Sequence, residues 1–274
     1  MDNLKQIITS FSSKDLEVRK NWYSPAAEAY NKTRPRYPQK LIEQVVEVAQ
    51  LSTESKILEI GCGPATATVA FAQLGYPMIC LEPNPNFFEL AQQNCQAYPN
   101  VVIQNTSFEE WTLEANKFDA VLAASSFHWI SPEVGYPKVA SALKENGDLI
   151  LLWNKELQPS YEVYQSLSKV YQLHAPSLNR YEDDETQQKI LRELGSMVID
   201  SEQFQELKFG QVKSDVVYTV DEYLSLLNTY SPYLKLALHS KEALFAGLRQ
   251  QIEDDFGGSL QLSFISAFHI AKKN

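Results

Sequence analysis

The stretch that decides the fold runs from Lys56 to Pro64 and reads Lys-Ile-Leu-Glu-Ile-Gly-Cys-Gly-Pro. Its first part suits a short buried strand, and two glycines follow at once. Residues 65–74, with the sequence ATATVAFAQL, then have the composition of a helix. This order predicts a loop that cradles a cofactor, because residues without a Cβ let the backbone turn tightly and approach a ligand closely.

Two residues after the glycines argue against a nicotinamide dinucleotide. The dinucleotide fingerprint has a third glycine three residues after the second, where this chain has Thr66. Pro64 has no N–H to offer a phosphate. Both features favour a ligand whose carboxylate and amine lie near the loop, and Glu59, near the end of the strand, is expected to serve more than packing.

An acidic residue, Glu82, lies at the end of the next predicted strand, roughly 20 residues after the glycine turn. A carboxylate at this spacing typically accepts hydrogen bonds from ribose hydroxyls. The alternative is an exposed acid in the turn Glu82-Pro83-Asn84-Pro85. The glycines upstream favour the ribose interpretation.

Strands and helices alternate at short spacing from residue 57 onward, which is typical of βαβ units and a parallel sheet. After the first unit, the pattern predicts strands at 78–81, 101–104, 118–124 and 148–153 and helices at 86–97 and 132–143. The fold class is therefore α/β, with a doubly wound sheet. Such sheets bind ligands beyond the carboxyl ends of their strands.

The rhythm changes after Asn154. Residues 155–200 are expected to be largely helical, and 203–210 and 211–218 extended. Thr219 and Glu222 resemble a capping box that opens a helix. We expect a single domain over 1–274, preceded by a helical N-terminal segment and carrying helical cap insertions toward its C-terminal half. Its predicted parts are a cofactor-binding core at 40–155, cap-forming helices and late strands at 156–258, and a final strand at 259–274.

Composition limits the partners. A net charge of −10 argues against nucleic acid, whose binding draws on a basic surface. The basic group Lys32, Arg34, Arg36 and Lys40 is explained more simply as a solvated face or a small carboxylate-binding site.

Three cysteines without a C-x-x-C pair indicate neither a disulfide framework nor a zinc site. No apolar run has the length of a signal peptide or a membrane span, so a cytoplasmic protein with no membrane partner is expected. The sequence carries no indication of oligomeric state.

Six short motifs occur in order between Trp22 and Trp153. They are Tyr-x-x-x-Arg-Pro-x-Tyr-Pro at 30–38, Leu-Glu-Ile-Gly-Cys-Gly at 58–63, Leu-Glu-Pro at 81–83, Ser-Phe-Glu-Glu-Trp at 107–111, Ser-Phe-His-Trp at 126–129 and Leu-Lys-Glu-Asn-Gly at 143–147. Their order and spacing resemble the class I S-adenosylmethionine-dependent methyltransferases, especially the type 11 and trans-aconitate-type branch. The resemblance implies a Rossmann-like, seven-stranded methyltransferase sheet and S-adenosylmethionine as the cofactor.

The resemblance also implies which residues bind that cofactor. The implied set is Arg34, Glu59, Gly61 and Gly63 at the methionine end, Glu82 and Pro83 at the ribose, Ser107 and Phe108 at the adenine, and Ala124 and Ser125 at the sulfonium. Two residues depart from the family pattern: Ala65 stands where a third glycine is usual, and Ser107 where an aspartate is common. For Ser107 and Phe108, the pattern alone equally favours a capped helix start with a core aromatic.

Methyl transfer from a sulfonium needs neither a metal nor a covalent nucleophile, since positioning can supply on the order of 7–11 kcal/mol of the barrier. His128 is the candidate general base, worth roughly 10²–10⁴-fold for an acceptor that must lose a proton. A histidine that merely shapes its loop is at least as well supported. Tyr23, Tyr30 and Trp129 are candidate contacts of a small-molecule acceptor, although such aromatics are more often core. The alternatives are a nicotinamide-dependent oxidoreductase and a non-catalytic S-adenosylmethionine-binding protein.

Overall fold

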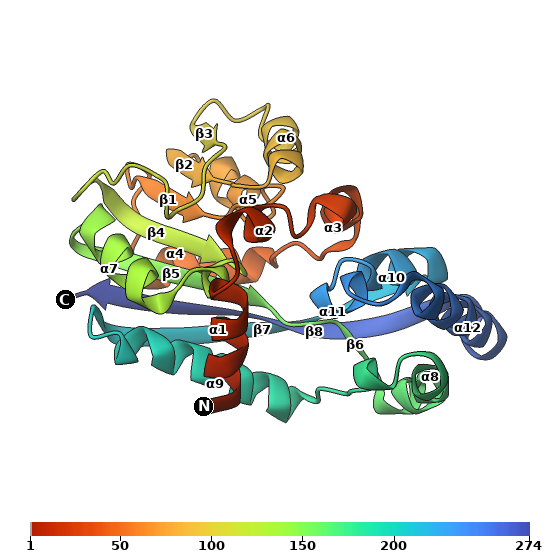
Figure 1. Ribbon diagram of the computed structural model, residues 1–274. Helices are drawn as coiled ribbons and strands as arrows, with labels where there is room; N and C mark the ends of the chain where they lie inside the picture. The colour runs from red at the N-terminus through yellow and green to blue at the C-terminus, as the bar shows by residue number, and fades with distance from the viewer. Residues whose placement is uncertain (1) are drawn as a thin grey trace.

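A mixed eight-stranded sheet runs the whole length of the computed structural model, which describes residues 2–274 (Figure 1). Strands β1 to β5 are parallel, β8 is antiparallel to β5, and β7 is antiparallel to β8. The order is β3-β2-β1-β4-β5-β8-β6, with β7 on the other side of β8. The strands are β1 (Ile57–Ile60), β2 (Met78–Leu81), β3 (Val101–Gln104), β4 (Phe118–Ala124), β5 (Leu143–Asn154), β6 (Gln158–Pro159), β7 (Phe204–Thr219) and β8 (Ser259–Lys273).

The predicted seven-stranded sheet is confirmed, and the two-residue β6 adds an eighth strand. Several elements differ from their predicted bounds. The strand expected at 148–153 begins already at Leu143, and the helix expected at 86–97 ends at Asn94. The helix expected at 65–74 begins only at Thr68, because Ala65 adopts a left-handed φ of +65° that a helix cannot contain. The two segments expected at 203–210 and 211–218 form one strand, in which Gly210 stays paired with Phe268.

Helices cover both faces of the sheet, and α8, α10 and α12 lie around the projecting ends of β7 and β8 (Figure 1). Local signals explain several starts: Asn84 caps α6 through the N–H of Phe87, and Thr219 and Glu222 form the predicted capping box. The helices are α1 (Asp2–Ser12), α2 (Leu16–Lys20), η1 (Ser24–Ala26), α3 (Ala27–Thr33), α4 (Gln39–Val48), α5 (Thr68–Gln73), α6 (Pro85–Asn94), η2 (Phe127–Trp129), α7 (Pro132–Ala142), α8 (Tyr161–His174), η3 (Pro176–Leu178), α9 (Asp184–Asp200), α10 (Val220–Leu227), α11 (Ser231–Leu234) and α12 (Leu238–Phe256).

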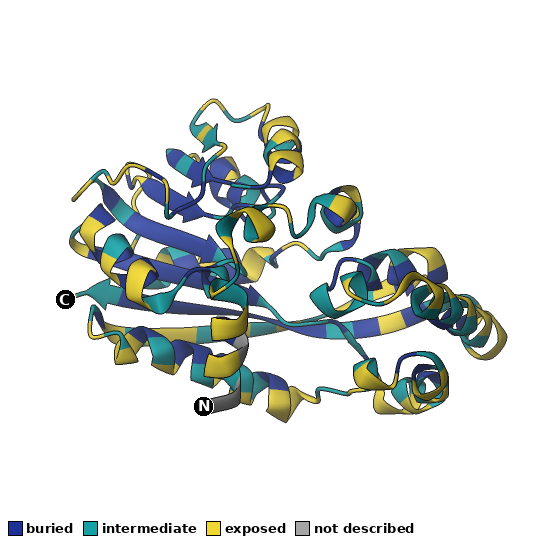
Figure 2. Ribbon diagram, in the orientation of Figure 1, coloured by how far each residue is buried: buried dark blue, intermediate teal, exposed yellow. Residues whose placement is uncertain are grey.

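Two apolar clusters sandwich the parallel strands. One contains residues of α7, α9 and one face of the sheet, and the other contains residues of α4, α5 and the opposite face. Figure 2 shows the central strands buried, whereas β7, at the edge, is largely exposed or half-buried. Burial on both faces explains why the parallel strands are continuous apolar runs.

Strands β7 and β8 are the longest strands of the described sheet and project beyond the parallel strands (Figure 1). Their projecting ends, together with α8, α10, α11 and α12, surround a third apolar cluster that includes Leu226, Leu244 and Leu262. We call this part the second lobe. It faces the N-terminal helices across the carboxyl edge of the parallel sheet, and this juxtaposition builds the site described next.

Candidate active site

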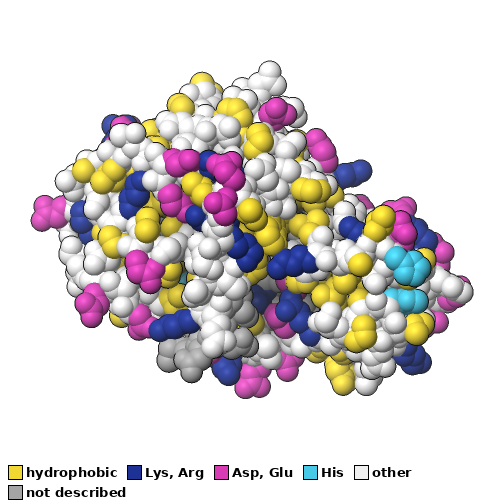
Figure 3. Space-filling model, viewed as in Figure 1, with side chains coloured by type: hydrophobic (Ala, Val, Ile, Leu, Met, Phe, Trp, Pro, Cys, Tyr) yellow, Lys and Arg dark blue, Asp and Glu magenta, His cyan; other side chains and the backbone are white. Residues whose placement is uncertain are grey.

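A cavity of about 610 Å³ lies at the carboxyl ends of the parallel strands, between the N-terminal segment and the second lobe. Figure 3 shows hydrophobic side chains in a central hollow, with lysine and arginine side chains around it. Among the predicted site residues, the following line the cavity: Tyr23, Tyr30, Arg34, Gly61, Gly63, Glu82, Pro83, Ser107, Phe108, Ala124, Ser125, His128 and Trp129. Of the predicted set, only Glu59 is absent from the wall.

The glycine turn after β1 forms one end of the cavity. Gly61 and Gly63 have φ values of +63° and +59°, in the left-handed region that favours glycine. A Cβ on Gly61 would lie 2.9 Å from the Cβ of Ser126, whereas a Cβ on Gly63 would meet nothing within 4 Å. Gly61 is therefore required for packing against the loop after β4, and Gly63 leaves open space for a ligand.

Glu82 lies directly beside this turn. One carboxylate oxygen accepts the backbone N–H of Gly63 at 2.7 Å, and the other accepts the N–H of Asn84 at 2.8 Å. Burial raises the pKa of Glu82 to about 7, against the opposing effect of the two backbone hydrogen bonds. The carboxylate is thus held rigidly at the cavity wall with acceptor capacity to spare, as recognition of hydroxyl groups requires.

Glu59 serves the loop from beneath. It is fully buried, its Oε2 accepts the hydroxyl of Thr68 at 2.6 Å and the thiol of Cys80 at 3.7 Å, and its Oε1 has no hydrogen-bond partner. Burial raises its pKa to about 8. Side chains alternate along a strand, and it is the neighbouring Ile60 that reaches the cavity. Glu59 therefore supports the start of α5 and does not contact the space where a ligand fits.

Arg34 joins the N-terminal segment to the second lobe. Its Nε donates to the hydroxyl of Thr229 at 2.8 Å, and its Nη2 donates to the carbonyl of the same residue at 2.9 Å. The guanidinium also lies 4.0 Å from the ring centroid of Tyr230 and 4.9 Å from that of Tyr30. These bonds use two of the five N–H donors of the guanidinium, so Nη1 and the second N–H of Nη2 are left for an anionic ligand group.

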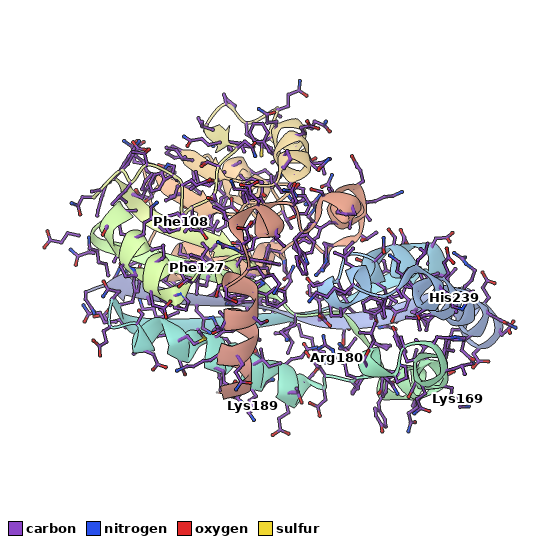
Figure 4. The ribbon with its side chains drawn as sticks, in the orientation of Figure 1. Phe108, Phe127, Lys169, Arg180, Lys189 and His239 are labelled. Atoms are coloured by element: carbon purple, nitrogen blue, oxygen red, sulfur yellow. The ribbon has the colours of Figure 1, made fainter. Side chains whose placement is uncertain are left out.

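In the loop after β3, Ser107 and Phe108 form a local cap with a packed aromatic ring and also lie at the cavity. The hydroxyl of Ser107 accepts the N–H of Glu110 at 3.2 Å and donates to its carboxylate at 2.8 Å, which is a local cap. The ring of Phe108 stacks on Trp111 with centroids 6.0 Å apart. Both residues still line the cavity, and Figure 4 shows Phe108 on the side of the parallel strands, away from the second lobe.

The loop after β4 also carries a left-handed residue, Ser125, with a φ of +54°. Its hydroxyl lies 3.0 Å from that of Tyr37 and accepts the N–H of Asn154 at 3.4 Å. The amide of Asn154 in turn donates to the carbonyl of Pro35 at 3.0 Å. The ends of β4 and β5 are thereby tied to the Arg-Pro-x-Tyr-Pro motif.

Aromatic rings close the other side of the cavity. His128 lies 5.9 Å from Phe11 and 5.7 Å from Trp129, measured between ring centroids. Trp129 also contacts Tyr23, which in turn contacts Tyr30. Burial lowers the pKa of His128 to about 4, so its imidazole is neutral at physiological pH. Helix α1 supplies Phe11 and thus covers this part of the site.

Several wall residues carry no local signal in the sequence. Trp153 and Asn154 end the fifth strand, whereas Tyr230 and Arg180 come from segments remote in the chain. Figure 4 shows Arg180 between the two lobes, where it forms an ion pair with Glu156 at 2.9 Å. The sequence could have indicated only Trp153 and Asn154, because they end a strand and such sheets bind ligands beyond their strand ends.

Comparison with known proteins agrees with this geometry. Residues 57–147 match the family model of a methyltransferase domain. Over 132 residues the chain is 30% identical to an uncharacterized methyltransferase of Mycobacterium tuberculosis, a match that covers 48% of this chain and 51% of that protein. The chain therefore spans about half the length of the mycobacterial relatives that it matches.

Solved structures share the fold. A putative type II methyltransferase of Anaeromyxobacter dehalogenans aligns with a TM-score of 0.67 at 18% identity, over 87% of this chain and 97% of that one. The phosphoethanolamine N-methyltransferase 2 of Haemonchus contortus, in complex with phosphomonomethylethanolamine and S-adenosylhomocysteine, aligns with a TM-score of 0.53 at 14% identity, over 93% of this chain and 58% of that one. No described helix has the length and apolar character needed to cross a membrane.

Proposed function

We propose, from the premise that the chain is a class I S-adenosylmethionine-dependent methyltransferase, that it transfers a methyl group to a small-molecule acceptor. The supporting observation is that a single cavity of about 610 Å³ joins the glycine turn to an aromatic and apolar chamber. Small-molecule sites are typically about 300–1,000 Å³. The chamber is covered by α1 and the second lobe, which favours a small acceptor over a macromolecule.

The residues at the glycine turn fit the cofactor. Glu82 offers a fixed carboxylate to hydroxyl groups, Gly63 leaves space beside it, and Arg34 keeps N–H donors for a carboxylate. When bound, S-adenosylmethionine supplies an electrophilic methyl group on a sulfonium. The protein then has to orient the acceptor and exclude water, and Ser125 and Tyr37 fix the wall at the end of β4 where this occurs.

His128 is the residue we propose to receive a proton from the acceptor. Its imidazole is neutral at physiological pH and lines the cavity, so an acceptor in the chamber lies beside a ring nitrogen that can take up a proton. A pKa of about 4 makes it a weak base, and we therefore assign most of the rate enhancement to positioning. An acceptor that is already deprotonated needs no base at all.

The decisive experiment incubates the protein with methyl-labelled S-adenosylmethionine and a metabolite extract. We expect label in a small organic product together with S-adenosylhomocysteine, and no label with Glu82→Ala, which loses the ribose-binding carboxylate. Label only in a protein or nucleic-acid fraction would contradict the small-molecule acceptor. Cofactor binding without product in any fraction would instead support a non-catalytic binding protein.

A further inference from the structure

Trp153 and His269 form a buried hydrogen-bonded pair behind the acceptor side of the cavity. The indole Nε1 of Trp153 donates to Nδ1 of His269 at 3.1 Å. The two residues are 8% and 2% exposed, respectively. Trp153 lines the cavity, with its ring centroid 6.1 Å from that of His128. The pair thus connects the cavity wall to the interior of the sheet.

The chemistry of the two rings permits only one arrangement. An indole N–H can only donate, and a neutral imidazole has one donor and one acceptor nitrogen. Nδ1 of His269 is therefore the acceptor, and Nε2 carries the hydrogen. A backbone hydrogen bond with Leu191 of α9 occupies the donor side, and burial, which lowers the pKa of His269 to about 4, keeps the ring neutral.

Close packing prevents the imidazole from turning. Gly195 of α9 faces it so closely that a Cβ there would lie 2.7 Å from Cδ2 and 2.8 Å from Nε2. On the β7 side, the ring of Phe209 lies 5.1 Å from the imidazole. Because α9, β7 and β8 together fix His269, they also fix the direction of the Nδ1 lone pair and with it the plane of the indole.

We propose that Trp153 is a wall against which the methyl acceptor is oriented, and that His269 is the positioning residue that holds the indole in place. The inference rests on the proposed function, because an acceptor must occupy the chamber. Trp153 shares the wall of the chamber with His128 and with the apolar side chains of Ile8 and Leu194. A misplacement of about 1 Å in such a wall can cost on the order of 10²-fold in rate.

The hydrogen bond is tested first, without any acceptor. His269→Leu removes the acceptor nitrogen, and His269→Asn places a carbonyl oxygen near the position of Nδ1. The control is His239→Leu, at an exposed histidine on α12 at the far end of the second lobe (Figure 4). The chain has four tryptophans, so its indole N–H NMR spectrum is simple, and Trp153→Phe identifies the relevant signal.

We expect His269→Leu to shift the Trp153 N–H signal and to accelerate its exchange with solvent. His269→Asn should retain the slow exchange, and His239→Leu should change nothing. With an acceptor identified by labelling, His269→Leu should lower kcat/KM for that acceptor by about tenfold or more, while the Kd for S-adenosylhomocysteine changes less than about twofold. His269→Asn should recover most of the loss.

The possible failures are distinguishable. A wild type that methylates no small molecule refutes the proposed function. An active wild type with an equally active His269→Leu variant refutes the positioning role, as does an unchanged Trp153 signal in that variant. An equal loss of cofactor affinity and acceptor kinetics would show that His269 merely stabilises the fold.

Discussion

Replacing Glu82 by glutamine tests how the cofactor is held at the cavity wall. The substitution keeps the shape of the side chain but replaces one acceptor oxygen by an NH₂ group. In the structure both oxygens accept a backbone N–H, from Gly63 at 2.7 Å and Asn84 at 2.8 Å. Whichever way the amide is turned, one of these N–H groups faces another donor.

The expected loss follows from these contacts. Hydrogen bonds to charged groups contribute roughly 1.5–3 kcal/mol each. A ribose hydroxyl that binds the carboxylate is one such interaction, made only in the complex, and its loss should raise the Kd for S-adenosylhomocysteine about 10- to 150-fold at pH 8. Glu89→Gln, an exposed carboxylate on α6, is the matched control and should bind as the wild type does. Isothermal titration calorimetry measures all three proteins.

The pH dependence supplies a second signature of Glu82. Burial raises its pKa to about 7, so below that pH most of the ligand-free protein holds a proton on Glu82 that hydroxyl recognition must release. Roughly a tenth of the carboxylate is ionised at pH 6 and roughly nine tenths at pH 8, and wild-type affinity should therefore rise about tenfold over this range. Glu82→Gln should have lost this rise. Wild-type affinity in the variant, or an identical rise in both proteins, would refute the reasoning.

Three further substitutions have defined outcomes. Glu59→Gln should raise Tm relative to the wild type by an amount that grows above pH 6. The buried carboxyl of the wild type, with its pKa raised to about 8, favours the native state only while protonated and loses that contribution as the pH rises. A difference in Tm between the two proteins that is the same at pH 6 and pH 9 would contradict this. Gly61→Ala should lower Tm more than Gly63→Ala, since both incur similar left-handed strain but only the first forces a contact, 2.9 Å from the Cβ of Ser126; equal losses would refute it. Arg34→Lys keeps the charge but loses the two guanidinium hydrogen bonds to Thr229 of the second lobe, and should reduce the free energy of unfolding in urea by about 1.5–3 kcal/mol. An unfolding midpoint equal to that of the wild type would show that these two hydrogen bonds are dispensable.

The parallel core could be predicted from the sequence because its determinants are local. Strands buried on both faces are apolar runs, and β2, β3 and β4 have the predicted bounds of 78–81, 101–104 and 118–124. Thr219 and Glu222 likewise form the capping box that their spacing indicated. These features depend only on residues within a few positions of one another.

The features of the site that the sequence did not predict depend on packing between segments far apart in the chain. Arg34 meets Thr229 only because β7 and β8 carry the second lobe to the N-terminal segment, a distance of 195 residues in sequence. Glu59 shows the converse limit: strand-end position indicated a ligand contact, but the alternation of side chains directs it to Thr68 and leaves Ile60 at the cavity. A register of one residue along a strand is decided by the whole sheet.

The departure from the family pattern at Ala65 leaves the geometry of the loop intact. Ala65 has a φ of +65°, nearly the value of Gly61 and Gly63, although a left-handed alanine costs roughly 1–2 kcal/mol. Its methyl group is fully buried, which returns about 0.8 kcal/mol, and an alanine loses less backbone entropy on folding than a glycine, by roughly 0.5–1 kcal/mol. These terms nearly cancel. The turn that we propose to receive the cofactor therefore keeps three left-handed residues with only two glycines, because burial and the smaller loss of backbone entropy together offset the strain of the third.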